Sequence, residues 1–178
     1  MAATFDEIGT VTADGTTTSI EVTGIPQSYD DLQVIFEFFV NSSSQTVETF
    51  ISVNSDTSVS TYNSDTMIYE ADGSYTYQED YNTYAGWRML NSPTNGGSGT
   101  PYYWANIIID MMQYTATRSK SFIARHCTEN VWGINGAMGA AGLGYRNTAA
   151  ISSIKLANAA GNNIGSGSTI TVYGIKNS

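Results

Sequence analysis

Apolar and polar residues alternate with a period of two over much of this chain, and no stretch has a convincing helical period. The most hydrophobic example is residues 32–40, LQVIFEFFV, where Leu32, Val34 and Phe36 share one face and Glu37 lies on the other. Successive side chains of a β-strand point to opposite faces, so this pattern is typical of a strand with a buried face. Its hydrophobicity predicts a place in the middle of a sheet. The pattern as a whole predicts an all-β fold.

Each end of the chain contains two alternating segments joined by a turn. Residues 4–11 and 17–23 flank the tripeptide ADG, which predicts an opening hairpin. Residues 147–158 and 168–176 flank a small polar loop whose glycines suit the left-handed conformations of a reversing chain. This second pair predicts a closing hairpin that seals a β-sandwich.

Further strands are expected in the middle and the second half of the chain, at residues 47–53, 103–111, 120–127 and 132–145. Between them, residues 54–100 form an expected long irregular insertion, with short strands around 67–70 and 74–78. With about nine strands and no helix, the expected architecture is an antiparallel two-sheet β-sandwich of jelly-roll type. We expect residues 1–178 to form a single domain of this kind.

The charge balance argues against two classes of partner. The chain has 7 Lys plus Arg against 16 Asp plus Glu, and its few cations are spread out. Nucleic-acid binding needs clustered cations, so neither DNA nor RNA is an expected partner, and neither is an anionic membrane. The start of the chain lacks the cations and apolar run of a signal peptide, so we expect synthesis in a cytoplasm.

Only 13% of the residues are charged, about half of the usual share. The surface must therefore be rich in Ser, Thr, Asn and Tyr, which lose little side-chain entropy when a neighbour immobilises them. Such a surface suits a protein that lives in an assembly. A stable β domain with no particular partner explains the composition equally well.

Few residues of this chain suggest a catalytic site. His126 is the only histidine, and the adjacent Cys127 must point to the opposite face of the same strand, so the two cannot act as base and nucleophile. Residues 54–58, NSDTS, resemble part of a calcium loop but lack its bidentate acid, which favours a polar turn. The neighbouring acids at 30–31 and 79–80 are expected to be solvated. We therefore predict that the chain is not an enzyme and that it has no catalytic residue, metal or cofactor.

Aromatic residues gather in one part of the chain. Six of them lie between positions 69 and 87: Tyr69, Tyr75, Tyr77, Tyr81, Tyr84 and Trp87. Aromatic side chains bring a large contact area with few torsions to freeze, so these six are the candidate protein–protein contact residues. They could also stack on sugar rings, or cover the flank of their own sandwich.

Four segments, ATFDEIGTV, IPQSYDDL, AAISSIKL and STITVYGIK, resemble a family of small virion proteins of tailed bacteriophages, particularly cyanobacterial and marine phages. The resemblance covers both ends of the chain, and it implies a β-sandwich that decorates capsids or belongs to a tail appendage. It brings no active-site residue with it.

The resemblance leads to the hypothesis of a capsid cement or decoration protein on the virion surface. Its expected partners are the major capsid protein and itself, as a homotrimer, after synthesis in the host cytoplasm. Residues 69–87 would form the contact surface, and the glycine-rich residues 133–144 a close subunit junction. The alternative is a receptor-binding tail module that recognises host-surface glycan. A polysaccharide-degrading enzyme is a third and weaker alternative.

Overall fold

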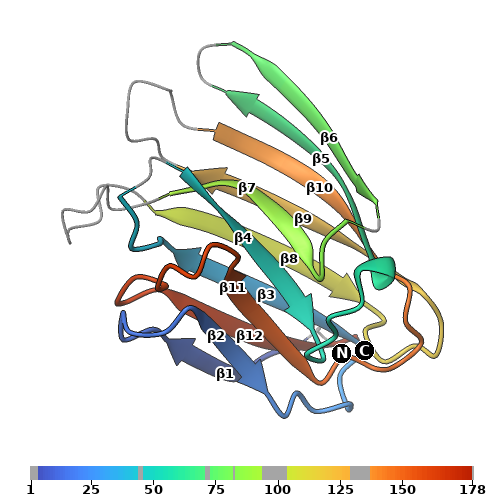
Figure 1. Cartoon of the computed structure of the whole chain (residues 1–178). Coiled ribbons are helices and arrows are strands. Elements are labelled where there is room, and N and C mark those ends of the chain that lie inside the picture. The colour runs from blue at the N-terminus through green and yellow to red at the C-terminus, as the bar shows by residue number, and fades with distance from the viewer. Residues whose placement is uncertain are drawn as a thin grey trace.

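A computed structural model describes residues 4–43, 46–70, 73–81, 83–93, 104–128 and 137–177. They form two antiparallel sheets that face each other, with the smaller sheet in front of the larger in Figure 1. The larger sheet runs in the order β1 (Thr4–Thr12), β12 (Thr169–Lys176), β3 (Asp31–Phe38), β8 (Ala105–Met112), β9 (Lys120–Thr128), β10 (Ala137–Tyr145), β5 (Tyr62–Glu70), β6 (Tyr75–Tyr81). The smaller sheet runs in the order β2 (Ser19–Thr23), β11 (Ser153–Asn158), β4 (Thr46–Val53), β7 (Trp87–Pro93). The predicted antiparallel two-sheet sandwich is confirmed.

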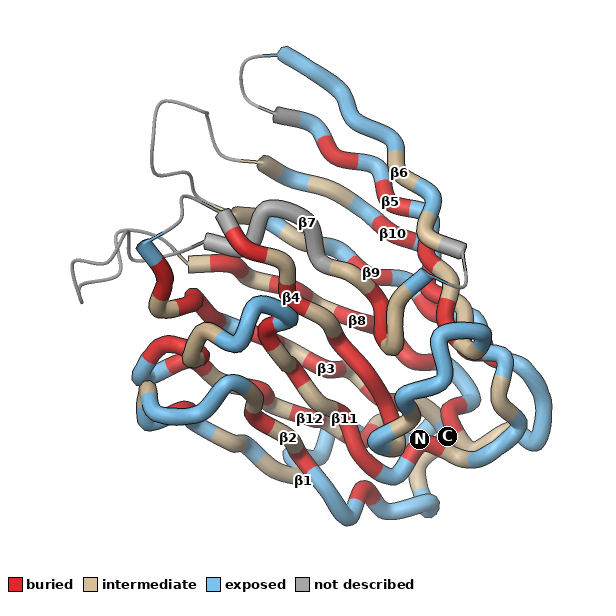
Figure 2. The backbone as a smooth tube through the Cα atoms, viewed as in Figure 1, coloured by how far each residue is buried: buried red, intermediate tan, exposed pale blue. Residues whose placement is uncertain are grey.

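The core lies between the inner faces of the two sheets. Leu32, Val34, Phe36 and Phe38 of β3 are all fully buried, as their alternation predicts. β3 lies between β12 and β8, so its expected place inside a sheet is also confirmed. Figure 2 shows the buried residues concentrated between the sheets, while β6 is mostly exposed at the margin of the larger sheet.

Both predicted hairpins are wrong. β1 pairs with β12 and β2 pairs with β11, so each pair of consecutive strands is divided between the two sheets. Gly15 and Gly167, at φ of 88° and 89°, allow the chain to turn from one sheet to the other. The two connections also bond to each other, through Ala13 N to Ser168 O at 2.8 Å and Gly167 N to Ala13 O at 2.9 Å. Alternation indicates which face of a strand turns inward, but a crossing between the two sheets satisfies it as well as a hairpin does.

The insertion predicted over residues 54–100 contains regular strands. The short strands expected around 67–70 and 74–78 belong to β5 and β6, and β7 was not predicted. Ser64 and Thr66 occupy buried positions of β5, which removes the contrast between apolar and polar residues on which the prediction depends. A 3₁₀ turn at Val59–Thr61 precedes β5.

Candidate functional site

The structure brings three of the six candidate aromatic residues together. Tyr69 of β5 and Tyr75 and Tyr77 of β6 are 55%, 60% and 51% exposed on the outer face of the larger sheet. Tyr69 lies directly across from Tyr75 in the antiparallel pair. Tyr81 ends β6, but its side chain lies outside the described residues.

Apolar residues that the sequence analysis did not single out continue this surface onto two further strands. Met67 of β5, Met138 of β10 and Ile123 of β9 are 49%, 62% and 52% exposed. Met138 lies opposite Tyr69, and Met67 lies opposite Tyr77. We call Met67, Tyr69, Tyr75, Tyr77, Ile123 and Met138 the outer apolar face.

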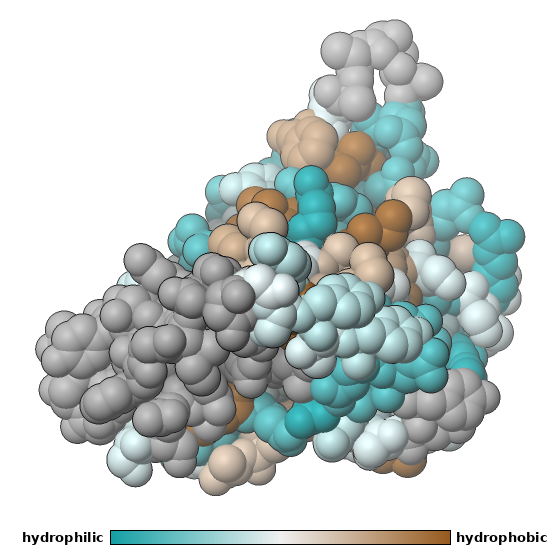
Figure 3. Space-filling model, turned by 90° about the horizontal axis from the view of Figure 1, so that it is seen from above, coloured by the Kyte–Doolittle hydropathy of each residue, from teal (hydrophilic) through white to brown (hydrophobic). Residues whose placement is uncertain are grey.

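A groove of about 610 Å³ runs over this part of the larger sheet. Met67, Tyr69, Tyr75 and Met138 line it together with Ile108 and Cys127, so its walls are mainly apolar. Seen from the end at which β5, β6 and β10 lie, apolar residues are exposed among polar ones (Figure 3). Arg125 also lines the groove, but its charge is neutralised by an ion pair with Asp110 at 2.9 Å.

One polar interaction orders the exposed edge of the outer apolar face. The Tyr77 hydroxyl donates to Glu79 Oε1 at 2.6 Å. This hydrogen bond, with help from burial and from the charges of Glu79 and Asp65, raises the pKa of Tyr77 to about 12. The phenol therefore stays protonated over the whole physiological range and remains a donor.

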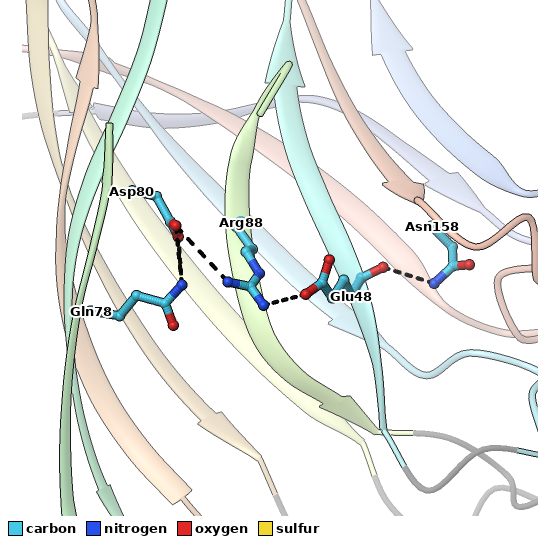
Figure 4. Close-up of polar contacts among 5 residues, drawn as sticks. All are labelled: Glu48, Gln78, Asp80, Arg88 and Asn158. Carbon is cyan, nitrogen blue, oxygen red and sulfur yellow. Dashed lines mark hydrogen bonds and ion pairs between the residues drawn. The ribbon is translucent and has the colours of Figure 1, made fainter. Parts of the chain in front are cut away.

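The inner side of β6 is tied to the smaller sheet by a chain of polar contacts (Figure 4). Gln78 Nε2 donates to Asp80 at 3.0 Å, and Asp80 lies 3.9 Å from the Arg88 guanidinium of β7. Arg88 also forms an ion pair with Glu48 of β4, and Asn158 Nδ2 donates to the Glu48 carbonyl at 2.9 Å. The two adjacent acids of β6 thus point to opposite sides, Glu79 outward and Asp80 inward.

Trp87 belongs to the core and not to a contact surface. It is 1% exposed, it packs edge-on against Tyr62 and Phe122, and its indole Nε1 donates to the Gly144 carbonyl at 2.9 Å. A side chain enclosed in this way cannot reach a partner, so the prediction that Trp87 is a contact residue is wrong. Trp87 covers the protein's own interior, which was one of the interpretations left open.

Tyr84 lies on a second surface, on the outer side of the smaller sheet. Its ring packs against Phe50 at a centroid distance of 5.0 Å, and Arg88 lies 5.2 Å from the ring centre. Phe50 and Tyr84 help to line a pocket of about 400 Å³ whose other walls are mostly polar. The polar side chains are Ser52, Ser55, Asp56, Thr57, Thr83, Lys155 and Asn158.

The His126 side chain lies against the backbone of β10. An added Cβ at Gly139 would lie 2.3 Å from His126 Nε2, which explains why a glycine faces it there. The nitrogen is buried with no hydrogen-bond partner among the described residues, and burial lowers the pKa of His126. Cys127 is exposed on the other face of the strand, so the prediction that the two side chains point to opposite faces is confirmed. At this position the glycine-rich strand approaches a side chain of its own chain.

Asp56 confirms that residues 54–58 form a polar turn. Burial opposes ionisation of this carboxyl, but hydrogen bonds from Ser58 N, Asn147 and Tyr145 outweigh it and lower its pKa. The Tyr145 hydroxyl donates to Asp56 Oδ2 at 3.0 Å. Within the described ranges, no group of three or more His, Cys, Asp or Glu could hold a metal, and no helix is long and apolar enough to cross a membrane.

No family model matches the chain, and no curated protein sequence matches it. Solved structures with a detectable likeness include the galectin LEC-6 of Caenorhabditis elegans, at 9% identity and a TM-score of 0.32 over 94% of this chain and 96% of that one. An aerolysin-like protein of Bombina maxima aligns at 9% identity and a TM-score of 0.13, over 86% of this chain and 97% of that one. The VP2 protein of infectious bursal disease virus aligns at 15% identity and a TM-score of 0.14, over 98% of this chain and 39% of that one. Likeness this low says nothing about function.

Proposed function

We propose that this chain is a structural protein of a bacteriophage virion, a cement or decoration protein that binds the capsid through the outer apolar face. The observation that carries the proposal is the exposure of Met67, Tyr69, Tyr75 and Met138 side by side on three neighbouring strands. Soluble monomers rarely expose a contiguous apolar patch without a function, and such patches commonly mark protein-binding sites.

The chemistry of the outer apolar face favours a protein partner. Tyrosine and methionine are enriched in the centres of protein interfaces, where charged residues are depleted. Tyr77 keeps its hydroxyl bonded to Glu79, so its ring can be covered without leaving an unsatisfied donor.

The phage assignment is supported by the four segments that resemble virion proteins. Two of the segments lie in β1 and β12 of the larger sheet, a third ends at the start of β3, and half of the fourth lies in β11 of the smaller sheet. β1, β12 and β3 lie at the end of the larger sheet opposite β5 and β6. We thus propose that one end of the larger sheet is a scaffold shared with such virion proteins, and that the other end carries a binding surface specific to this chain.

The first test replaces Tyr69, Tyr75 and Met138 together by Ser and measures binding to capsids that lack this protein. Central interface residues contribute more than about 1 kcal/mol each, so we expect affinity to fall by roughly 100-fold or more. All three side chains are exposed, so the melting temperature should change little.

The matched control replaces Phe5, Val59 and Met112 by Ser, because these residues are also apolar and exposed but lie outside the outer apolar face. This control should bind capsids as the wild type does. Equal binding by both triple variants would reject the outer apolar face as the contact surface.

The copy number per virion is a second test. We expect a number near parity with the capsid protein, or a simple fraction of it, whereas a handful of copies would place the protein on the tail.

A second candidate function, a receptor-binding tail module for host glycan, is favoured by the pocket that Phe50 and Tyr84 help to line. Aromatic rings beside hydroxyl, amide and charged groups suit the apolar and polar faces of a sugar. Lys155 adds a cation that forms no ion pair among the described residues, so it is available to an acidic sugar. If this candidate is right, Tyr84→Ala should abolish binding on a glycan array, while the Tyr69/Tyr75/Met138 variant should bind normally.

A further inference from the structure

Among the described residues the two sheets have four edge strands, and β6 is the one best able to pair with another chain. β1 has an irregular register at Glu7 to Gly9, and β7 contains Pro93 and pairs with β4 across a second irregularity. β2 is only 5 residues long. Proteins use bulges, prolines and short length in this way to prevent edges from pairing. β6 has no bulge or proline, and its 7 residues pair with β5 without a break in register, so its only edge-protecting residues are the acids Glu79 and Asp80.

We propose that two copies of this chain associate through β6, antiparallel to each other, so that their larger sheets join into one. Identical antiparallel strands are related by a two-fold axis, and the axis would pass through Gln78, the middle residue of β6. The proposal goes beyond binding to the capsid, because it concerns contact between copies and stands whether or not the capsid is the partner.

The register centred on Gln78 is set by the side chains of β6. It places Tyr77 of one copy opposite Glu79 of the other, on the outer side of the sheet. These two residues already form a hydrogen bond within one chain, at 2.6 Å, so their chemistry is complementary. On the inner side, Thr76 would face Asp80 and the Gln78 amides would face each other, each pair offering a donor and an acceptor.

The acids of β6 do not oppose this register. No acid lies directly opposite another, whereas a shift of the axis to Glu79 or Asp80 would pair like charges face to face. Asp80 is also close to Arg88 of its own chain, at 3.9 Å. Pairing between β6 and β1 of a second copy is less favourable, because β1 contains Asp6 and Glu7 near its irregular register.

Pairing through β6 would give a larger binding surface. Tyr75 and Tyr77 lie on the edge strand itself, so the outer apolar faces of the two copies would adjoin across the axis. The resulting dimer has two-fold symmetry, so it would replace the homotrimer of the capsid hypothesis.

The test combines a mass measurement with cysteine cross-linking in a Cys127→Ser background, since Cys127 is an exposed thiol. Multi-angle light scattering should give twice the chain mass of 19.2 kDa. Under mild oxidation Gln78→Cys should form an intermolecular disulfide, because directly opposed residues in antiparallel strands lie about 5 Å apart. The matched control is Thr76→Cys on the same side of the same strand, which faces Asp80 and should not cross-link to itself.

A mixture of Thr76→Cys and Asp80→Cys proteins should cross-link to a heterodimer, which checks the register independently. Each reduced variant should melt as the Cys127→Ser parent does, which shows that it is folded. A monomeric or trimeric mass would overturn the proposal, as would a dimer in which Thr76→Cys cross-links to itself and Gln78→Cys does not. Capsid binding is measured separately, so either proposal can fail without the other.

Discussion

Trp87→Ala should destabilise the protein by about 3–5 kcal/mol, more than the replacement of any of the other five candidate aromatic residues. The indole is enclosed by Tyr62, Tyr145 and Phe122, with ring centroids 5.5, 6.5 and 5.8 Å away. Truncation would leave a large cavity between the two sheets and remove the donor to the Gly144 carbonyl. Chemical denaturation followed by fluorescence or circular dichroism measures the loss.

Two further variants distinguish packing from hydrogen bonding and core from surface. Trp87→Phe keeps a ring in the cluster but removes the indole N–H, so it should cost less than Trp87→Ala. Tyr75→Ala removes an exposed ring and should change the free energy of unfolding by less than about 0.5 kcal/mol. If Trp87→Ala were as mild as Tyr75→Ala and also lost capsid binding, Trp87 would be a contact residue after all.

Alternation predicted the core of the larger sheet well, because the strands there bury one apolar face and expose one polar face. In β9, the strand expected at residues 120–127, Phe122 and Ala124 are buried while Ile123 and Arg125 are exposed. The sequence could not show which strands pair. The same alternation satisfies a hairpin and a crossing between sheets, and the crossing becomes evident only from the pairing of β1 with β12 and of β2 with β11.

The candidate site was only partly predictable, because tyrosine density does not distinguish surface from core. Tyr75 and Tyr77 lie on an edge strand and are exposed, while Trp87, a few residues on, enters the smaller sheet and is buried. Ile123 and Met138 were missed because they come from other strands. Ile123 does give a signal, since it is an apolar residue on the same face of its strand as the charged Arg125.

Lys120→Met should cost about 3 kcal/mol at neutral pH, although it replaces a charged residue by an apolar one of similar length. Lys120 is 4% exposed, and its Nζ donates to the carbonyls of Arg118, Asn147 and Ala149 at 3.1, 3.2 and 2.8 Å. Hydrogen bonds from charged donors contribute roughly 1.5–3 kcal/mol each, and the variant would leave three carbonyls without this donor. The ammonium thus holds the start of β9 to residues 147–149, which lead into β11.

The stability lost in Lys120→Met should also depend on pH. Burial lowers the pKa of Lys120 below its ordinary value of 10.5, so between the two values the unfolded chain binds more protons than the folded protein. Stability contributed by Lys120 therefore rises with pH in that window, and the gap between wild type and Lys120→Met should widen as the pH approaches 10.5. Lys176→Met is the matched control: Lys176 is exposed, and its replacement should be nearly neutral. A loss below 1 kcal/mol for Lys120→Met would mean that water reaches the three carbonyls, and that the buried ammonium stabilises the loop far less than its contacts indicate.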